Sequence, residues 1–337
     1  MLRVWRLTFL SSLFLMTACS DHPQPQSSVK LTPASILHAD FSADGQLAIG
    51  TLEQIAVYSP YGELQHLLDL PRAQGSWHPV WLMPDLLAVK DGADLLLWQP
   101  GIGATHGPWR PRENLIANMF KLDGRLLLTY ADGTELLQHQ PLVHSEMPPR
   151  LSFVSLPVPS SQPLHQAKSD ASGVSFRAYA GGLLQASTAQ SPTPIWQRQL
   201  EHNGYIRALE IDNAKLHLIT QESADPFARG RSQKVVQVDA ETGIVIQSVP
   251  LLIDSQAISL LSDPPYLYIG GSENCLFAVL SAETSQRLCY PKARRWGQDS
   301  GQVIALYQNA DTLFAVTSSG HLQIWDKHDI VSLLTDK

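Results

Sequence analysis

Short apolar segments separated by turn residues run along most of the chain. One kind of segment follows a turn and alternates small and apolar residues, which is the pattern of a strand buried in a sheet. It recurs roughly every 40 to 50 residues, a period typical of repeat architectures. The copies are residues 46–51, 86–91, 125–130, 215–220, 266–271 and 312–317, with a weaker copy at 173–180. The spacing predicts one repeated unit.

Other short strands flank each copy of this segment. A strand precedes it and ends in a tight turn, such as Asp44-Gly45 or Asp123-Gly124, and Asp-Gly pairs favour such turns. A third and a fourth strand follow. Four antiparallel strands in each period predict a propeller blade, and seven periods predict seven blades. A different division of residues 151–172, which are rich in Pro and Ser, gives six or eight blades.

The best copy of the hairpin lies near the end of the chain. Residues 316–326, VTSSGHLQIWD, combine a Ser-Gly turn with an alternating strand that ends in Trp325-Asp326. This stretch resembles the repeat of WD40-type propellers, while the turns at 238–243 and 280–285 are similar to those of quinoprotein-type propellers. The resemblance implies an all-β, seven-bladed propeller of four-stranded antiparallel blades over residues 31–337.

The last blade has to close the ring, because an open sheet edge favours pairing with other chains. Two closures fit the sequence. The blade takes an N-terminal strand near residues 29–31, or it completes its own sheet with residues 330–334.

Composition excludes several classes of protein. The chain has 337 residues, of which 44% are apolar and 16% charged, so it can form a large core and is not expected to be disordered. Its net charge of −7 argues against general nucleic-acid binding, which needs a basic surface. No long apolar run follows residue 20, so we expect no internal membrane helix.

The N-terminus predicts export. Arg3 and Arg6 precede a short apolar stretch at 7–16, which is too short to span a bilayer. The following Thr17-Ala18-Cys19 resembles a bacterial lipobox, with Met16 where Leu is usual. The resemblance implies a lipoprotein signal peptide at 1–18 and acylation of Cys19. The alternative is an ordinary signal peptide that is cleaved after Ala18.

Residues 19–30 are polar and rich in Pro, Gln and Ser, which predicts a flexible tether after the lipidated cysteine. Ser20 occupies the position where Asp favours retention in the inner membrane. The resemblance to lipoproteins therefore implies a location on the outer membrane, facing the periplasm.

Two further cysteines, Cys275 and Cys289, flank the turn at 280–285 symmetrically. In an antiparallel hairpin they face each other on neighbouring strands. The periplasm is oxidising, so a disulfide that fastens this blade is expected. The alternative is two reduced, unpaired thiols.

The sequence contains no catalytic motif that we can identify, and we expect a non-enzymatic protein without cofactor or metal ion. Its twelve histidines are scattered. Single histidines within strands, such as His38 and His217, are expected to be structural. The carboxylates at the turns are expected to serve turn formation.

The loops between the outer strand of one blade and the inner strand of the next open on one face of a propeller. Several combine aromatic residues with arginine, which are the residue types enriched at binding hot spots. The predicted partner-binding residues are Arg72, Trp77, Trp109, Arg110, Arg112, Tyr205, Arg294, Arg295 and Trp296. The alternative is that these tryptophans pack as wedges between blades, with arginines stacked on them.

These features predict a lipid-anchored periplasmic scaffold whose rim binds a protein partner during envelope assembly or maintenance. Its blade pattern and lipobox resemble those of the lipoprotein propeller in the outer-membrane barrel-assembly machinery. The competing prediction is a propeller that binds or converts a sugar, lactone or cofactor in its central channel. The sequence does not indicate the oligomeric state.

Overall fold

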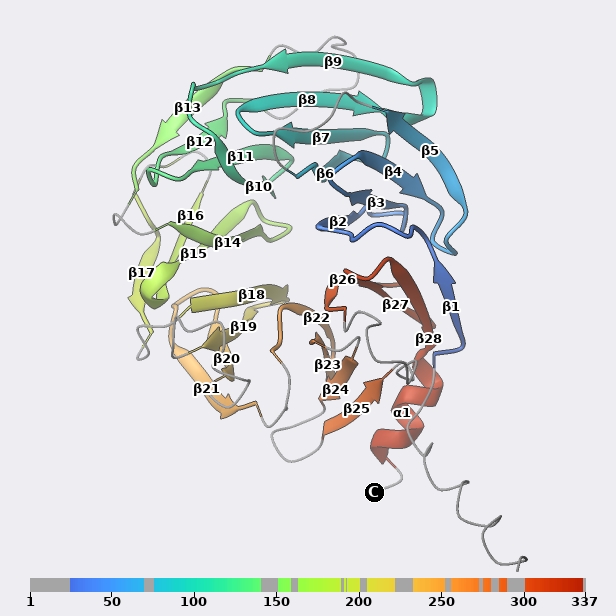
Figure 1. The fold of residues 1–337 in the computed structure, drawn as a ribbon. Coiled ribbons are helices and arrows are strands. Elements are labelled where there is room, and N and C mark those ends of the chain that lie inside the picture. Colours follow the sequence, from blue (N-terminus) through green and yellow to red (C-terminus); the bar gives the residue numbers. More distant parts are fainter. Residues whose placement is uncertain are drawn as a thin grey trace, which may run out of the picture.

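A computed structural model describes residues 25–69, 76–140, 151–158, 163–188, 191, 193–200, 205–221, 233–251, 256–272, 275–279, 285–289 and 301–335. These residues form seven four-stranded antiparallel sheets arranged as blades around a central axis (Figure 1). The predicted all-β class and the count of seven blades are confirmed.

The first four blades follow one another along the chain, and each runs from its inner to its outer strand. Blade 1 consists of β2 (His38–Phe41), β3 (Leu47–Gly50), β4 (Gln54–Tyr58) and β5 (Leu64–Asp69). Blade 2 consists of β6 (His78–Met83), β7 (Leu86–Asp91), β8 (Asp94–Gln99) and β9 (Ala104–Trp109), with the short 3-10 helix η1 (Pro100–Ile102) before β9. Blade 3 consists of β10 (Ile116–Leu122), β11 (Arg125–Tyr130), β12 (Glu135–Gln138) and β13 (Phe153–Leu156). Blade 4 consists of β14 (Leu164–Ser169), β15 (Val174–Tyr179), β16 (Leu183–Thr188) and β17 (Trp196–Gln199), with the 3-10 helix η2 (Ala180–Gly182) before β16.

The remaining blades complete the ring. Blade 5 consists of β18 (Tyr205–Asp212), β19 (Lys215–Gln221), β20 (Gln233–Asp239) and β21 (Val245–Pro250). Blade 6 consists of β22 (Ser259–Asp263), β23 (Tyr266–Gly270), β24 (Cys275–Val279) and β25 (Ser285–Cys289). Blade 7 consists of β26 (Val303–Gln308), β27 (Thr312–Thr317), β28 (His321–Asp326) and, as its outer strand, β1 (Ser27–Lys30).

The structure resolves the two alternative closures. Strand β1 pairs with β28 in antiparallel register, from Ser27 opposite Ile324 to Lys30 opposite His321. The predicted boundary between tether and propeller is therefore wrong: the propeller begins at Ser27, because these residues form the fourth strand of blade 7. Residues 330–334 lie instead in the helix α1 (Lys327–Thr335), which follows β28 (Figure 1).

The Trp-Asp pair contributes to packing at the end of the ring. Trp325 is buried in the cluster between blades 6 and 7, where Ile330 and Leu334 of α1 cover it. The Asp326 carboxylate accepts the backbone N–H of His328 at 2.8 Å, so it stabilises the start of α1.

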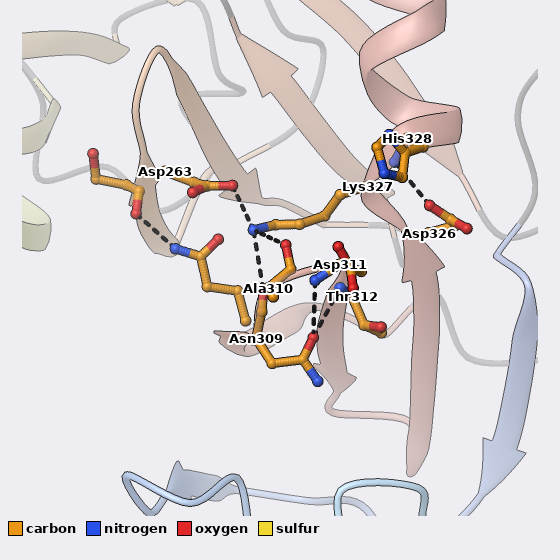
Figure 2. Close-up of polar contacts among 10 residues, drawn as sticks. Asp263, Asn309, Ala310, Asp311, Thr312, Asp326, Lys327 and His328 are labelled. Carbon is orange, nitrogen blue, oxygen red and sulfur yellow. Dashed lines mark hydrogen bonds and ion pairs between the residues drawn. The ribbon is translucent and has the colours of Figure 1, made fainter.

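Lys327 ties blades 6 and 7 together on the same side of the ring. Its ammonium lies 2.7 Å from the Asp263 carboxylate of blade 6. It also donates to the carbonyl oxygens of Asn309 and Ala310 in blade 7 (Figure 2). One side chain therefore joins two turns from neighbouring blades.

The hydrophobic core is divided among the blade interfaces. In the described part of the chain, buried apolar side chains form seven clusters, and each cluster draws on two neighbouring blades. The alternation that predicted the strands therefore places side chains on both faces of each sheet against the adjacent blades. Blades approach closely at Gly50, where a Cβ atom would lie 2.0 Å from the carbonyl oxygen of Trp77, so only glycine fits there.

The antiparallel order gives the ring two distinct faces. We call the upper face the side on which the inner strands begin, at His38, His78, Ile116, Leu164 and Tyr205. It carries the loops from outer to inner strands and the turns between second and third strands. The lower face is the side on which the inner strands end.

Candidate functional site

Four of the predicted partner-binding residues lie outside the described residues: Arg72, Arg294, Arg295 and Trp296. Trp77 is described, and its prediction as a rim residue is wrong. Its side chain is 2% exposed and packs between blades 1 and 2 with Trp81 and Trp98. Trp77 therefore packs as a wedge between blades, as the alternative interpretation of the sequence predicted.

Trp109, Arg110 and Arg112 lie on or beside the upper face. Trp109 ends the outer strand β9 and is partly buried against the core between blades 2 and 3, so it is not a free loop residue. Arg110 makes two hydrogen bonds to Asp94, at 2.8 and 3.0 Å. Arg112 lies 3.5 Å from Asp132, with its guanidinium 5.5 Å from the Tyr130 ring. Carboxylates on neighbouring turns thus hold both arginines.

Tyr205 connects the upper face to the central channel. Its ring stacks on His165, with centroids 4.9 Å apart and planes 10° apart. The guanidinium of Arg207 lies 5.4 Å from the tyrosine ring. The structure therefore places Tyr205 at the channel mouth, at the interface of blades 4 and 5.

The channel itself holds a cavity of about 440 Å³. The inner strands β2, β6, β10, β14, β18 and β26 contribute to its wall. Its polar lining residues are His38, Asp40, His78, Asn118, Lys121, His165, Gln166 and Lys168. The prediction from sequence missed this set and assigned His38 a structural role.

His38 and His78 begin the inner strands of blades 1 and 2 and stack face to face. Their ring centroids are 4.0 Å apart, and their planes differ by 9°. Burial lowers the pKa of His38 to about 4, and the nearby Lys90 ammonium adds to this. Burial also lowers the pKa of His78 well below its usual range, with smaller effects from His38 and Lys90. Both rings are therefore neutral at pH 7.

Asp40 lies deeper along the same wall. Its Oδ2 accepts the backbone N–H of Trp81 at 2.7 Å, which joins blade 1 to blade 2. Burial raises the pKa of Asp40 to about 6, although this hydrogen bond and the ammoniums of Lys121 and Lys168 oppose the shift. The carboxyl therefore changes charge close to neutral pH.

Acidification is expected to destabilise the fold through the histidine pair. Between pH 6.5 and about 4, unfolded His38 binds a proton that the folded residue does not, so stability falls as pH decreases. His78 acts in the same direction. For His38 alone, the loss between pH 7 and 5 is about 2 kcal/mol. Asp40 opposes it, because the folded carboxyl takes up its proton first. Urea denaturation at both pH values is the measurement.

The double variant His38→Asn, His78→Asn should show a smaller loss of stability between pH 7 and 5 than the unmodified chain. An unchanged loss in this variant would rule out the pair as its source. The charged group that acts on both rings is the Lys90 ammonium, which lowers the pKa of His38 and of His78.

The two cysteines of blade 6 lie opposite each other on neighbouring strands. Cys275 of β24 and Cys289 of β25 are Cα partners in the antiparallel ladder. This pairing is the one that the symmetric spacing predicted, and the disulfide between them stays a prediction.

The described residues contain neither a cluster of metal-ligating side chains nor a membrane-spanning helix. No group of three or more His, Cys, Asp or Glu side chains in these ranges is placed to hold a metal ion. Within the same ranges, no helix has the length and apolar character needed to cross a membrane. Cys19 lies outside the described residues.

No protein-family model and no curated protein sequence matches the chain. Solved structures match it in fold. The WD40 domain of Pan2 from Neurospora crassa matches with a TM-score of 0.67 at 14% identity, covering 90% of this chain and 97% of that chain. A chain of the mitotic checkpoint complex matches with a TM-score of 0.68 at 13% identity, covering 96% of this chain and 99% of that chain.

The designed protein Ika8 also matches, with a TM-score of 0.59 at 12% identity, covering 90% of this chain and 100% of that chain. The chain therefore has the β-propeller fold of these WD40 structures. At such low sequence identity, structural similarity establishes the fold alone. Function depends on the residues of the site.

Proposed function

We propose that this protein is a non-enzymatic, lipid-anchored scaffold of the bacterial envelope whose upper face holds a protein partner. The observation that carries the proposal is the direction of β1. Because β1 pairs antiparallel to β28, Ser27 lies at the lower face and Lys30 at the upper face. An anchor at Cys19 would therefore join the propeller at its lower face.

The tether limits how far the propeller can move from the membrane. Residues 20–26 separate Cys19 from Ser27, and seven extended residues reach at most about 25 Å. The lower face beside β1 and α1 would stay close to the bilayer, while the upper face would point away from it. This orientation leaves the upper face accessible to a partner in the periplasm.

The upper face offers side chains suited to a protein partner. Arg110 is 47% exposed and Arg112 38% exposed, even though each contacts a carboxylate. Tyr205 is partly exposed at the channel mouth. Neighbouring residues already orient these arginine and tyrosine side chains. The side chains therefore lose little conformational freedom when a partner binds, which favours affinity. Ser20 after the lipidated cysteine favours the outer membrane as the location.

Crosslinking in intact cells tests the proposal with three matched forms of the full chain. We expect the unmodified chain to fractionate with membranes and to crosslink to a discrete partner. The variant Arg110→Ala, Arg112→Ala should lose this crosslink but stay in the membrane fraction. The variant Cys19→Ser should move to the soluble fraction, since it has no acylated residue.

The control is Arg125→Ala, Lys215→Ala, which alters two cations at lower-face turns. It should keep both the crosslink and the membrane location. Equal crosslinking by the upper-face variant would refute the proposed docking face. Retention of Cys19→Ser in membranes would refute the anchor.

A further inference from the structure

The central cavity is not needed for a partner that docks on the rim. Its volume of about 440 Å³ falls within the range of small-molecule sites, about 300 to 1,000 Å³. Polar side chains from four consecutive blades converge on it.

Basic groups form an upper layer in the cavity wall. His38 and His78 stack at the mouth, and Nε2 of His38 lies 3.1 Å from the Ser76 hydroxyl. Nδ1 of His78 is buried without a hydrogen-bond partner among the described residues. Behind the rings, Lys90 donates to the carbonyl oxygens of Ile116 and Ala117. Burial lowers the pKa of Lys90, and the Asp91 carboxylate opposes this shift.

A second basic layer lies deeper in the channel. Lys168 of blade 4 pairs with Glu210 of blade 5 at 2.5 Å, so its charge is balanced. Lys121 of blade 3 is exposed to the cavity and has no ion-pair partner among the described side chains. Asp40 is the carboxyl that lines the same space, and it accepts the backbone N–H of Trp81.

The titratable groups that line the cavity are mainly basic, in contrast to those of the whole chain. The chain carries a net charge of −7, whereas two lysines and three histidines line the cavity against one aspartate. The basic groups occur at two depths, with the neutral histidine pair at the mouth and the lysines below it, and the amides of Asn118 and Gln166 lie beside them. Such an arrangement is complementary to an elongated molecule with an anionic group at each end.

We propose that the central channel binds a small di- or tricarboxylate, with one carboxylate at Lys121 and another at the stacked pair His38 and His78. The carboxylate at the mouth accepts N–H groups of the imidazoles and stabilises their protonated form. The second carboxylate takes the ammonium of Lys121 as its ion-pair partner. The amides of Asn118 and Gln166 face the body of the ligand.

Calorimetric titration of the folded propeller with citrate tests this proposal. We expect saturable binding at a single site, with mannitol as a neutral probe that does not bind. Lys121→Gln and His78→Gln should each weaken citrate binding by about tenfold or more, which corresponds to the loss of one charge-assisted contact. Lys215→Gln, which removes an exposed lysine of the lower face, should bind citrate as the unmodified chain does.

Proton uptake gives a second and independent readout. Because a bound carboxylate favours imidazolium, the heat of binding at pH 5 should change with the ionisation enthalpy of the buffer, and less so in His78→Gln. Absence of saturable binding by both citrate and succinate would overturn the proposal, as would equal weakening in Lys215→Gln. Binding of a hexaglutamate peptide without binding of citrate would assign the carboxylates to a protein partner and also overturn it. Neither result affects the test of the rim, which uses different variants.

Discussion

A soluble chain that begins at Leu31 is expected to lose much of its stability compared with one that begins at Ser20. The shorter chain lacks β1, which makes four register pairs with β28. At about 1 kcal/mol for each pair, the loss is about 4 kcal/mol. The exposed edge of β28 then favours pairing between chains. Thermal unfolding and size-exclusion chromatography measure the two effects.

The matched control is a chain that begins at Gln26. It lacks most of the tether but keeps β1, so its unfolding temperature should equal that of the chain from Ser20. If the chain from Leu31 is as stable and as monomeric as these two, the outer strand does not close the ring. The same comparison separates the role of residues 27–30 in folding from any role of the preceding tether in anchoring.

The repeat was predictable because blade formation depends on short-range patterns. Alternating apolar residues and Asp-Gly turns specify hairpins locally, and the period then specifies the blades. Closure was left with two alternatives, because residues 29–31 and 330–334 are both short and mixed in character. Ile330 and Leu334 are four residues apart, which is helical spacing, and this feature was the available signal for α1.

The candidate site was harder to predict, because its residues are distant in sequence. His38 and His78 appeared as isolated histidines, yet their separation of 40 residues matches the period of the blades. Residues at equivalent positions of consecutive blades lie side by side. The separation of 40 residues could therefore have predicted the stacked pair. The burial of Trp77 could not be predicted in this way, because it depends on the close approach at Gly50.

The interface between blades 3 and 4 contains a charged pair inside the core. Nη1 of Arg177 in β15 lies 2.7 Å from Oε2 of Glu135 in β12, and the two side chains are 3% and 1% exposed. Burial raises the pKa of Glu135, and the Arg177 charge opposes the shift. The Arg177 charge therefore favours the ionised form of this buried carboxyl.

Arg177→Met is expected to lower the free energy of unfolding at pH 7 by about 3 to 5 kcal/mol, because it leaves a buried carboxylate without its cation. The double variant Glu135→Leu, Arg177→Met should recover most of this loss, since an apolar pair of similar volume needs no desolvation of charge. Urea denaturation measures all three chains. The exposed Arg110→Met is the control and should change little, because surface ion pairs contribute little.

The pH dependence of the single variant separates loss of charge from loss of packing. Without Arg177, the pKa of Glu135 rises further, so the folded carboxyl holds a proton that the unfolded one releases. The deficit of Arg177→Met should therefore shrink as pH falls from 7 to 5. A deficit that is equal at both pH values, or that the double variant does not reduce, would mean that the arginine stabilises the interface by its packing instead of its charge.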